Sequence, residues 1–119
     1  MAVTATELKQ KHCTPCEGGV PPLSAKEVKE LLATLSDWKL TADGQRIRRE
    51  WKVKDFLAGL DFFQRIGRLA EEEGHHPDLH LAGYRNVAVE VWTHAIGGLS
   101  ENDFILAAKI DTLPVAVKK

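Results

Sequence analysis

Histidines dominate one stretch of the 119-residue chain. Four of the five lie between positions 75 and 94, namely His75, His76, His80 and His94. Because imidazole titrates near neutral pH, histidines gathered around a helix end and a loop could give and take protons in a reaction. Adjacent imidazoles resist being charged together, so one could stay neutral as a base while another acts as an acid. The alternative is a structural role, since a charged histidine at a helix C-terminus interacts favourably with the helix dipole.

Two carboxylates stand at spacings that bear on these histidines. Glu71 lies four residues before His75, so a helix that continues that far would bring the two side chains together. There Glu71 would hold one imidazole tautomer, whereas an ordinary exposed pair would contribute only about 0.3–0.5 kcal/mol. Asp103 follows Ser100 by three residues, the spacing of the acid in a capping box. Asp103 is therefore expected to cap a helix.

His94 stands at the end of a predicted strand that begins at residue 84 or 86. In this strand three valines alternate with Ala88, Glu90 and Trp92, the pattern of an antiparallel sheet with two distinct faces. Parity puts His94 on the face opposite the valines. If helices cover the valine face, His94 points away from them, unless a bulge or the strand end turns it. His80 is expected to be the outward residue of a short strand.

The two cysteines form a Cys13-x2-Cys16 pair with His12 beside it. A zinc site needs four ligands, and the second pair would have to come from the histidines near position 75. A redox dithiol should open a helix, but glycines and prolines follow here. We therefore expect no metal and no redox role.

The apolar pattern predicts three helices and four strands. Ser24 and Glu27 form a capping box before helix 25–35, and Asp55 begins a helix 56–73 that ends at Gly74. The core-facing stripe of that helix is predicted to contain Phe56, Leu60, Phe63, Gly67 and Ala70, with Phe62, Ile66 and Leu69 beside it. The other elements are strands 38–41, 46–51, 79–82 and 84–94 and a helix from 101. The order α-β-β-α-β-β-α predicts an α+β fold, a four-stranded antiparallel sheet with three helices packed on one face.

Both ends of the chain are expected to lie outside this packing. Residues 1–23 are predicted to form an N-terminal extension, because the run that contains the cysteines is too rich in glycine and proline for a helix or a central strand. The folded domain is assigned to residues 24–119, and its last residues, 114–119, are expected to form a loose tail. Because the helices leave one sheet face uncovered, that face or the sheet edges favour self-association.

Composition narrows the functional classes. Hydrophobic residues make up 44% and charged residues 28% of the chain, as in a soluble globular domain. Sixteen Lys and Arg against seventeen Asp and Glu give a net charge of -1, so the basic footprint of a nucleic-acid binder is missing. No run of apolar residues is long enough to span a membrane, and no secretory signal opens the chain. Two cysteines are too few for a disulfide framework, so the expected location is cytoplasmic.

The spacing of the candidate residues as a whole is more specific. Glu71-x3-His75-His76-Pro77-x6-Tyr84-x9-His94-x8-Asp103 resembles the active-site signature of the pterin-4a-carbinolamine dehydratases. The similarity extends over residues 24–113, although the chain departs from the family's usual pattern at Gly74, Leu79 and Asn102.

This resemblance implies an activity and an assembly. It implies a dehydratase that converts 4a-hydroxytetrahydropterin to quinonoid dihydropterin in tetrahydropterin recycling, as a homodimer or homotetramer without metal or cofactor. It implies catalytic roles for His75, His76 and His94. Supporting or substrate-binding positions would be Glu71, Pro77, Tyr84 and Asp103.

A second function remains open at this point. Some members of the family act as dimerisation partners of a transcription factor, and others are linked to molybdopterin metabolism, which implies a non-catalytic binding module. Retention of three titratable histidines at the signature spacing favours catalysis.

Overall fold

The computed structural model describes residues 4–11, 13 and 22–118. Its elements are α1 (Ala5–Gln10), α2 (Ala25–Leu32), β1 (Lys39–Leu40), β2 (Ile47–Lys52), α3 (Phe56–Glu73), β3 (Asp78–Ala82), β4 (Asn86–Val91), a 3₁₀ turn η1 (His94–Ile96) and α4 (Glu101–Ile110). The predicted order of three helices and four strands is confirmed, and α1 precedes it. Among the described helices none is long and apolar enough to cross a membrane.

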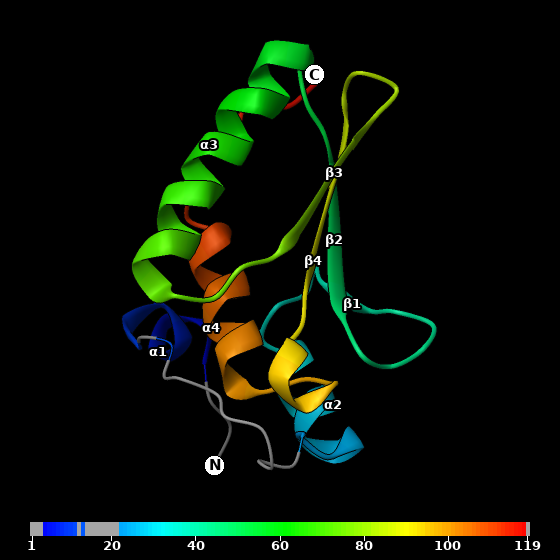
Figure 1. Ribbon diagram of the computed structural model, residues 1–119, viewed down its shortest axis with the longest axis vertical. Coiled ribbons are helices and arrows are strands. Elements are labelled where there is room, and N and C mark those ends of the chain that lie inside the picture. The colour runs from blue at the N-terminus through cyan, green and yellow to red at the C-terminus, as the bar shows by residue number, and fades with distance from the viewer. Residues whose placement is uncertain (1–3, 12, 14–21, 119) are drawn as a thin grey trace.

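The four strands form one antiparallel sheet in the order β1-β2-β4-β3. Trp51 of β2 and Leu81 of β3 both pair with Val87 of the central strand β4, so alternate residues of neighbouring strands share a face. Helices α3 and α4 lie on one side of this sheet, and α2 lies near the N-terminal end of α4 (Figure 1). The architecture is therefore the expected α+β fold with helices on one face.

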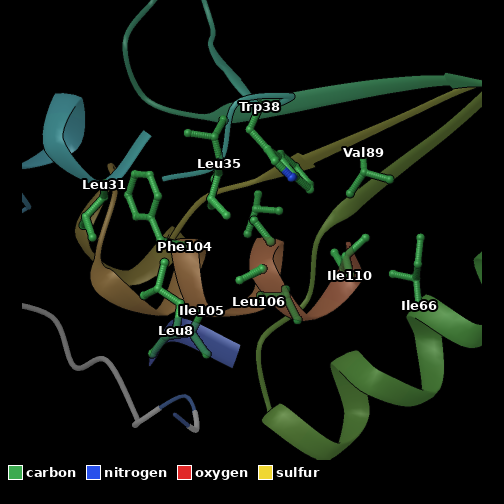
Figure 2. Packing of buried hydrophobic residues seen from close by; sticks show 14 of the residues in the cluster. Leu8, Leu31, Leu35, Trp38, Ile66, Val89, Phe104, Ile105, Leu106 and Ile110 are labelled. Carbon is green, nitrogen blue, oxygen red and sulfur yellow. The ribbon is translucent and has the colours of Figure 1, made fainter. Parts of the chain in front are cut away.

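Helix α4 forms the middle of the molecule. Every residue from Asn102 to Ala108 is buried, as is Ile110, because α1 packs against α4 and the sheet and α3 flank it. Figure 2 shows Phe104, Leu106 and Ile110 among side chains contributed by the sheet and the other helices. Asp103 is the most buried polar side chain of this segment, with none of its surface exposed.

Helix α3 begins and ends where the sequence predicted. The side chain of Asp55 accepts the Ala58 N–H at 2.8 Å, and Gly74 ends the helix in the left-handed conformation with φ of 64°. The predicted core stripe was partly wrong, because Phe56 and Leu60 are 48% and 43% exposed. The buried positions are Gly59, Phe62, Ile66 and Ala70.

Strand β4 is shorter than predicted. It ends at Val91, and the next paired residue, Thr93, donates its N–H to the Gly98 carbonyl at 2.9 Å. His94 therefore begins the 3₁₀ turn instead of ending a strand, and strand parity does not decide where its side chain points.

Both ends of the chain are more closely packed than expected. Leu8 of α1 is fully buried in the core, so the prediction that residues 1–23 lie outside it was wrong at this position. At the other end the Lys118 N–H binds the Lys52 carbonyl and the Lys54 N–H binds the Ala116 carbonyl, so the tail pairs with the end of β2. A domain boundary at residue 24 stays a prediction.

Candidate active site

The site is built around one hydrogen bond between α4 and the turn after α3. His75 follows the left-handed Gly74, and its N–H returns to the Ala70 carbonyl at 3.2 Å. This turn directs its ring toward α4, where Nε2 lies 2.6 Å from Oδ1 of Asp103. The His75 side chain is 12% exposed and that of Asp103 not at all, so water hardly competes for this contact.

The second carboxylate oxygen of Asp103 binds two further donors. Oδ2 accepts the Thr93 hydroxyl at 2.9 Å and the Ser100 N–H at 2.9 Å. The Ser100 hydroxyl lies 2.7 Å from the Thr93 hydroxyl, so it can donate to Thr93 while Thr93 donates to Asp103. Three donors on two oxygens satisfy a buried carboxylate in the first turn of a helix, where the dipole also favours negative charge. The capping role predicted for Asp103 is confirmed, and the same side chain binds His75.

Thr93 brings a second histidine-bearing segment to the same carboxylate. His94 is the next residue and begins η1, while the position of its ring lies outside the part of the chain that the structure describes. The backbone around residue 94 is fixed by the Thr93–Gly98 bridge and the Thr93–Asp103 bond. Segments separated in sequence by β3 and β4 thus meet at Asp103.

The predicted pair Glu71–His75 does not form. Because α3 ends at Glu73 and Gly74 reverses the backbone, Glu71 lies 3.5 Å from Nε2 of His76 instead. Both side chains are largely exposed, at 81% and 62%. Pro77 follows in a half-buried position and leads into β3.

The remaining candidates lie away from this cluster. His80 is exposed on the face of the sheet opposite the helices, as expected. Tyr84 lies in the turn at the far end of β3, 56% exposed, with the Arg85 guanidinium 5.0 Å from its ring centre. Within one chain Tyr84 does not join His75 and Asp103, and its predicted support of the substrate stays a prediction.

The uncovered face of the sheet carries a separate charged cluster. Arg46 lies over the Trp92 ring at 4.5 Å and pairs with Glu90 at 3.0 Å, while Arg48 also pairs with Glu90. Burial works to raise the pKa of Glu90, but hydrogen bonds from Arg48 and Arg46 outweigh it and hold that pKa below its usual value. These contacts stabilise the sheet and do not touch the His75 site.

Among residues 4–11, 13 and 22–118, no three His, Cys, Asp or Glu side chains are grouped so that they could hold a metal ion. Burial and the neighbouring Glu73 raise the pKa of the Cys13 thiol to about 12. His12 and Cys16 lie outside the described residues.

Sequence reasoning missed one buried ion pair next to the site. Glu73, two residues before His75, binds Lys109 of α4 at 3.1 Å, and their side chains are 4% and 14% exposed. The two residues lie 36 positions apart, and nothing in their local sequence indicates the contact.

Comparison with known proteins identifies the family. The family model for pterin 4 alpha carbinolamine dehydratase matches residues 21–113, which include every residue of the cluster described above. The chain belongs to the pterin-4-alpha-carbinolamine dehydratase family. A relative from Arabidopsis thaliana, pterin-4-alpha-carbinolamine dehydratase 2, mitochondrial, is 51% identical over 92% of this chain and 60% of its own length. The chain therefore spans about three fifths of that relative.

Other members of the pterin-4-alpha-carbinolamine dehydratase family match over nearly their whole length. A putative pterin-4-alpha-carbinolamine dehydratase from Methylococcus capsulatus is 46% identical over 92% of this chain and 95% of its own. The crystal structure of transcriptional coactivator/pterin dehydratase from Brucella melitensis superposes with a TM-score of 0.70 at 31% identity, covering 76% of this chain and 95% of that one. The family is one of enzymes, the lyases that remove water from a pterin carbinolamine.

Proposed function

We propose that this protein dehydrates 4a-hydroxytetrahydropterins to quinonoid dihydropterins by histidine acid–base catalysis. The observation that carries the proposal is the Asp103 carboxylate, which binds the His75 ring and also accepts the hydroxyl of Thr93, the residue before His94. Family membership supplies the substrate class.

The reaction needs two proton transfers at different atoms. The C4a–O bond breaks, and an acid must protonate the hydroxyl so that it leaves as water. The N5 lone pair forms the new C4a–N5 double bond, and a base must take the N5 proton. Groups that titrate near neutral pH can do both, and solvent returns the proton from the base to the acid after each turnover.

His75 and His94 are the residues proposed to exchange these protons, in an order that we leave open. A carboxylate at Asp103 accepts from Nε2 of His75, so in the neutral ring the proton sits on Nε2 and Nδ1 is the nitrogen left to accept one. This tautomer follows from the hydrogen-bond network. Asp103 is thus proposed to orient the ring.

The other signature residues are proposed to bind or support the pterin. His76 is exposed beside His75 and is proposed to orient the substrate, with Glu71 as its partner. Pro77 and Tyr84 complete the supporting set. A homodimer or homotetramer, a cytoplasmic location and a part in tetrahydropterin recycling belong to the same proposal.

The test follows the ultraviolet decay of freshly generated 4a-hydroxytetrahydropterin with and without the protein. Replacing His75 or His94 by Ala should lower the rate about 10²–10⁴-fold. His80→Ala is the matched control, because His80 is exposed on the opposite sheet face, and it should leave the rate unchanged. A loss below about threefold in both the His75 and His94 variants would reject the assignment of general acid and base.

The alternative is a non-catalytic partner-binding module. The name of the Brucella melitensis protein contains both coactivator and dehydratase, and this supports a binding role as the second candidate function. Folded wild-type protein that fails to accelerate the decay would favour that alternative.

A further inference from the structure

The proposed dehydration mechanism gives no role to the buried carboxylate of Glu73. Its side chain is 4% exposed, Oε2 lies 3.1 Å from Lys109 Nζ, and Oε1 accepts the Cys13 N–H at 2.8 Å. A charge removed from water in this way is costly unless it is paired and hydrogen-bonded. Because both oxygens are engaged, the last residue of α3 is held in place two positions before His75.

The donor from Cys13 belongs to a segment that crosses both helix ends at the site. We call residues 4–11 and 13 the N-terminal strap. Its helix α1 packs against α4 below the C-terminal end of α3 (Figure 1), and Leu8 lies beside Ile105 in the core (Figure 2). The strap therefore rests on the core, anchored by a fully buried leucine.

The polar contacts of the strap fall on residues adjacent to the site. Lys11 Nζ lies 2.9 Å from Glu101 Oε1, and Cys13 Sγ lies 3.6 Å from the Asn102 carbonyl. Glu101 and Asn102 directly precede Asp103, as Glu73 precedes His75 by two. One segment thus contacts both the end of α3, just before His75, and the start of α4, just before Asp103. The side chains of His75 and Asp103 make the 2.6 Å contact.

We propose that the N-terminal strap is a positioning element, which acts through Glu73 and the first turn of α4 to hold His75 against Asp103. The inference rests on the catalytic role proposed for His75. A hydrogen bond between the turn after α3 and the first turn of α4 persists only while both segments keep their place, and small misplacements of reacting groups cost much of the rate. Loss of the strap contact should therefore lower turnover without removing any residue that touches substrate.

A pair of substitutions at one position isolates the contact. Cys13→Pro removes the backbone N–H that Glu73 accepts. Cys13→Ala keeps that N–H and removes only the thiol, whose 3.6 Å contact with the Asn102 carbonyl is weak because a thiol is a weak donor. Val53→Ala is the stability control, because Val53 is fully buried beside the N-terminal half of α3, at the end away from Glu73. All three are made in the full chain and compared at a temperature where each is folded.

Two readouts are measured for each variant. The first is kcat and KM for freshly generated 4a-hydroxytetrahydropterin. The second is the ¹⁵N spectrum of the imidazole nitrogens without substrate, which reports the His75–Asp103 hydrogen bond whether or not the protein is an enzyme.

Cys13→Pro is expected to lower kcat about tenfold or more with KM changed less than about twofold, and to move the Nε2 signal of His75. Cys13→Ala and Val53→Ala are expected to leave kcat within about twofold of wild type and the Nε2 signal in place. An unmoved His75 signal and unchanged kcat in Cys13→Pro overturn the strap proposal. So does an equal loss of kcat in Val53→Ala. A wild-type protein without activity refutes the proposed function instead, and the imidazole spectra still decide the strap.

Discussion

The carboxylate of Asp103 and the imidazole of His75, 28 residues apart in sequence, lie 2.6 Å apart on two different segments. The same carboxylate accepts the Thr93 hydroxyl and the Ser100 N–H. Asp103 therefore caps α4 and binds His75 at once, so we expect changes at this residue to affect both stability and turnover.

Asp103→Asn tests the effect of this carboxylate on turnover. An amide keeps the size of the side chain but can present an N–H to Nε2, which reverses the tautomer of His75. We expect kcat to fall about 10²–10⁴-fold, as when the orienting acid of a histidine is lost elsewhere. Glu72→Gln, an exposed carboxylate in the last turn of α3, is the matched control and should change the rate little. Equal rates in the Asn variant and wild type would contradict the role of Asp103.

Thr93→Val tests the hydroxyl that connects Asp103 to Ser100. Valine has the same shape but cannot donate, so a buried carboxylate loses one of its three donors. The free energy of unfolding should fall by about 1.5–3 kcal/mol, measured by urea denaturation. We expect kcat to fall about tenfold, because the carboxylate that orients His75 is less well held.

The conservative variant separates the hydroxyl from the packing. Thr93→Ser keeps the donor and loses a methyl group, so it should recover most of the rate while remaining less stable than wild type. A serine variant as slow as the valine variant would show that packing, and not the hydrogen bond, is what matters at this position.

Features that depend on neighbouring residues were predictable from the sequence. The bounds of α3 were correct because Asp55 and Gly74 act locally, one as an N-cap and the other through a left-handed φ. The capping box of α2 was correct for the same reason, since Ser24 and Glu27 bind each other's backbone N–H.

Features set by tertiary packing were not predictable in this way. The core stripe of α3 was partly wrong, because apolar periodicity does not show that the helix meets the sheet at Gly59, where an added Cβ would come within 3.2 Å of the Leu81 side chain. That glycine marks the face on which α3 approaches the sheet closely. Leu8, a single leucine in a polar stretch, gave no periodic signal although it is fully buried.

The same distinction between local and tertiary features applies to the site. The spacing predicted His75, His76, His94 and Asp103 as candidates, and their catalytic roles stay predictions. The contact between His75 and Asp103 was not predicted. Helical geometry pointed to Glu71, and the left-handed turn at Gly74 instead leaves Glu71 beside His76. The contacts of His75 with Asp103 and of Glu73 with Lys109 join residues 28 and 36 positions apart, so they depend on the tertiary fold.

Glu90 gives a prediction about acid stability. Its folded pKa lies below the ordinary value of 4.5, so its contribution to stability is present above about pH 4.5 and is lost as pH falls through the folded pKa. Glu90→Gln should therefore lower the free energy of unfolding near pH 6 and much less near pH 3.5, with urea titrations as the measurement. The difference should be about 1 kcal/mol or less, because Arg48 is partly exposed and solvent screens the pair. Glu50→Gln, whose carboxylate is 69% exposed beside Arg48, is the control and should show a smaller difference.

Cys13 gives a prediction about thiol reactivity. With the pKa raised from 9.0 to about 12 by burial and by Glu73, the thiolate fraction near pH 8 is about a thousandfold lower than that of an ordinary cysteine. In a Cys16→Ser variant, where Cys13 is the remaining cysteine, alkylation by iodoacetamide followed by mass spectrometry should be at least about a hundredfold slower than for a free peptide thiol. The rate should rise to the peptide value in denaturing urea, where the strap no longer rests on Glu73. Fast alkylation of the folded protein near pH 8 would mean that Cys13 does not stay in the buried position beside Glu73 in solution.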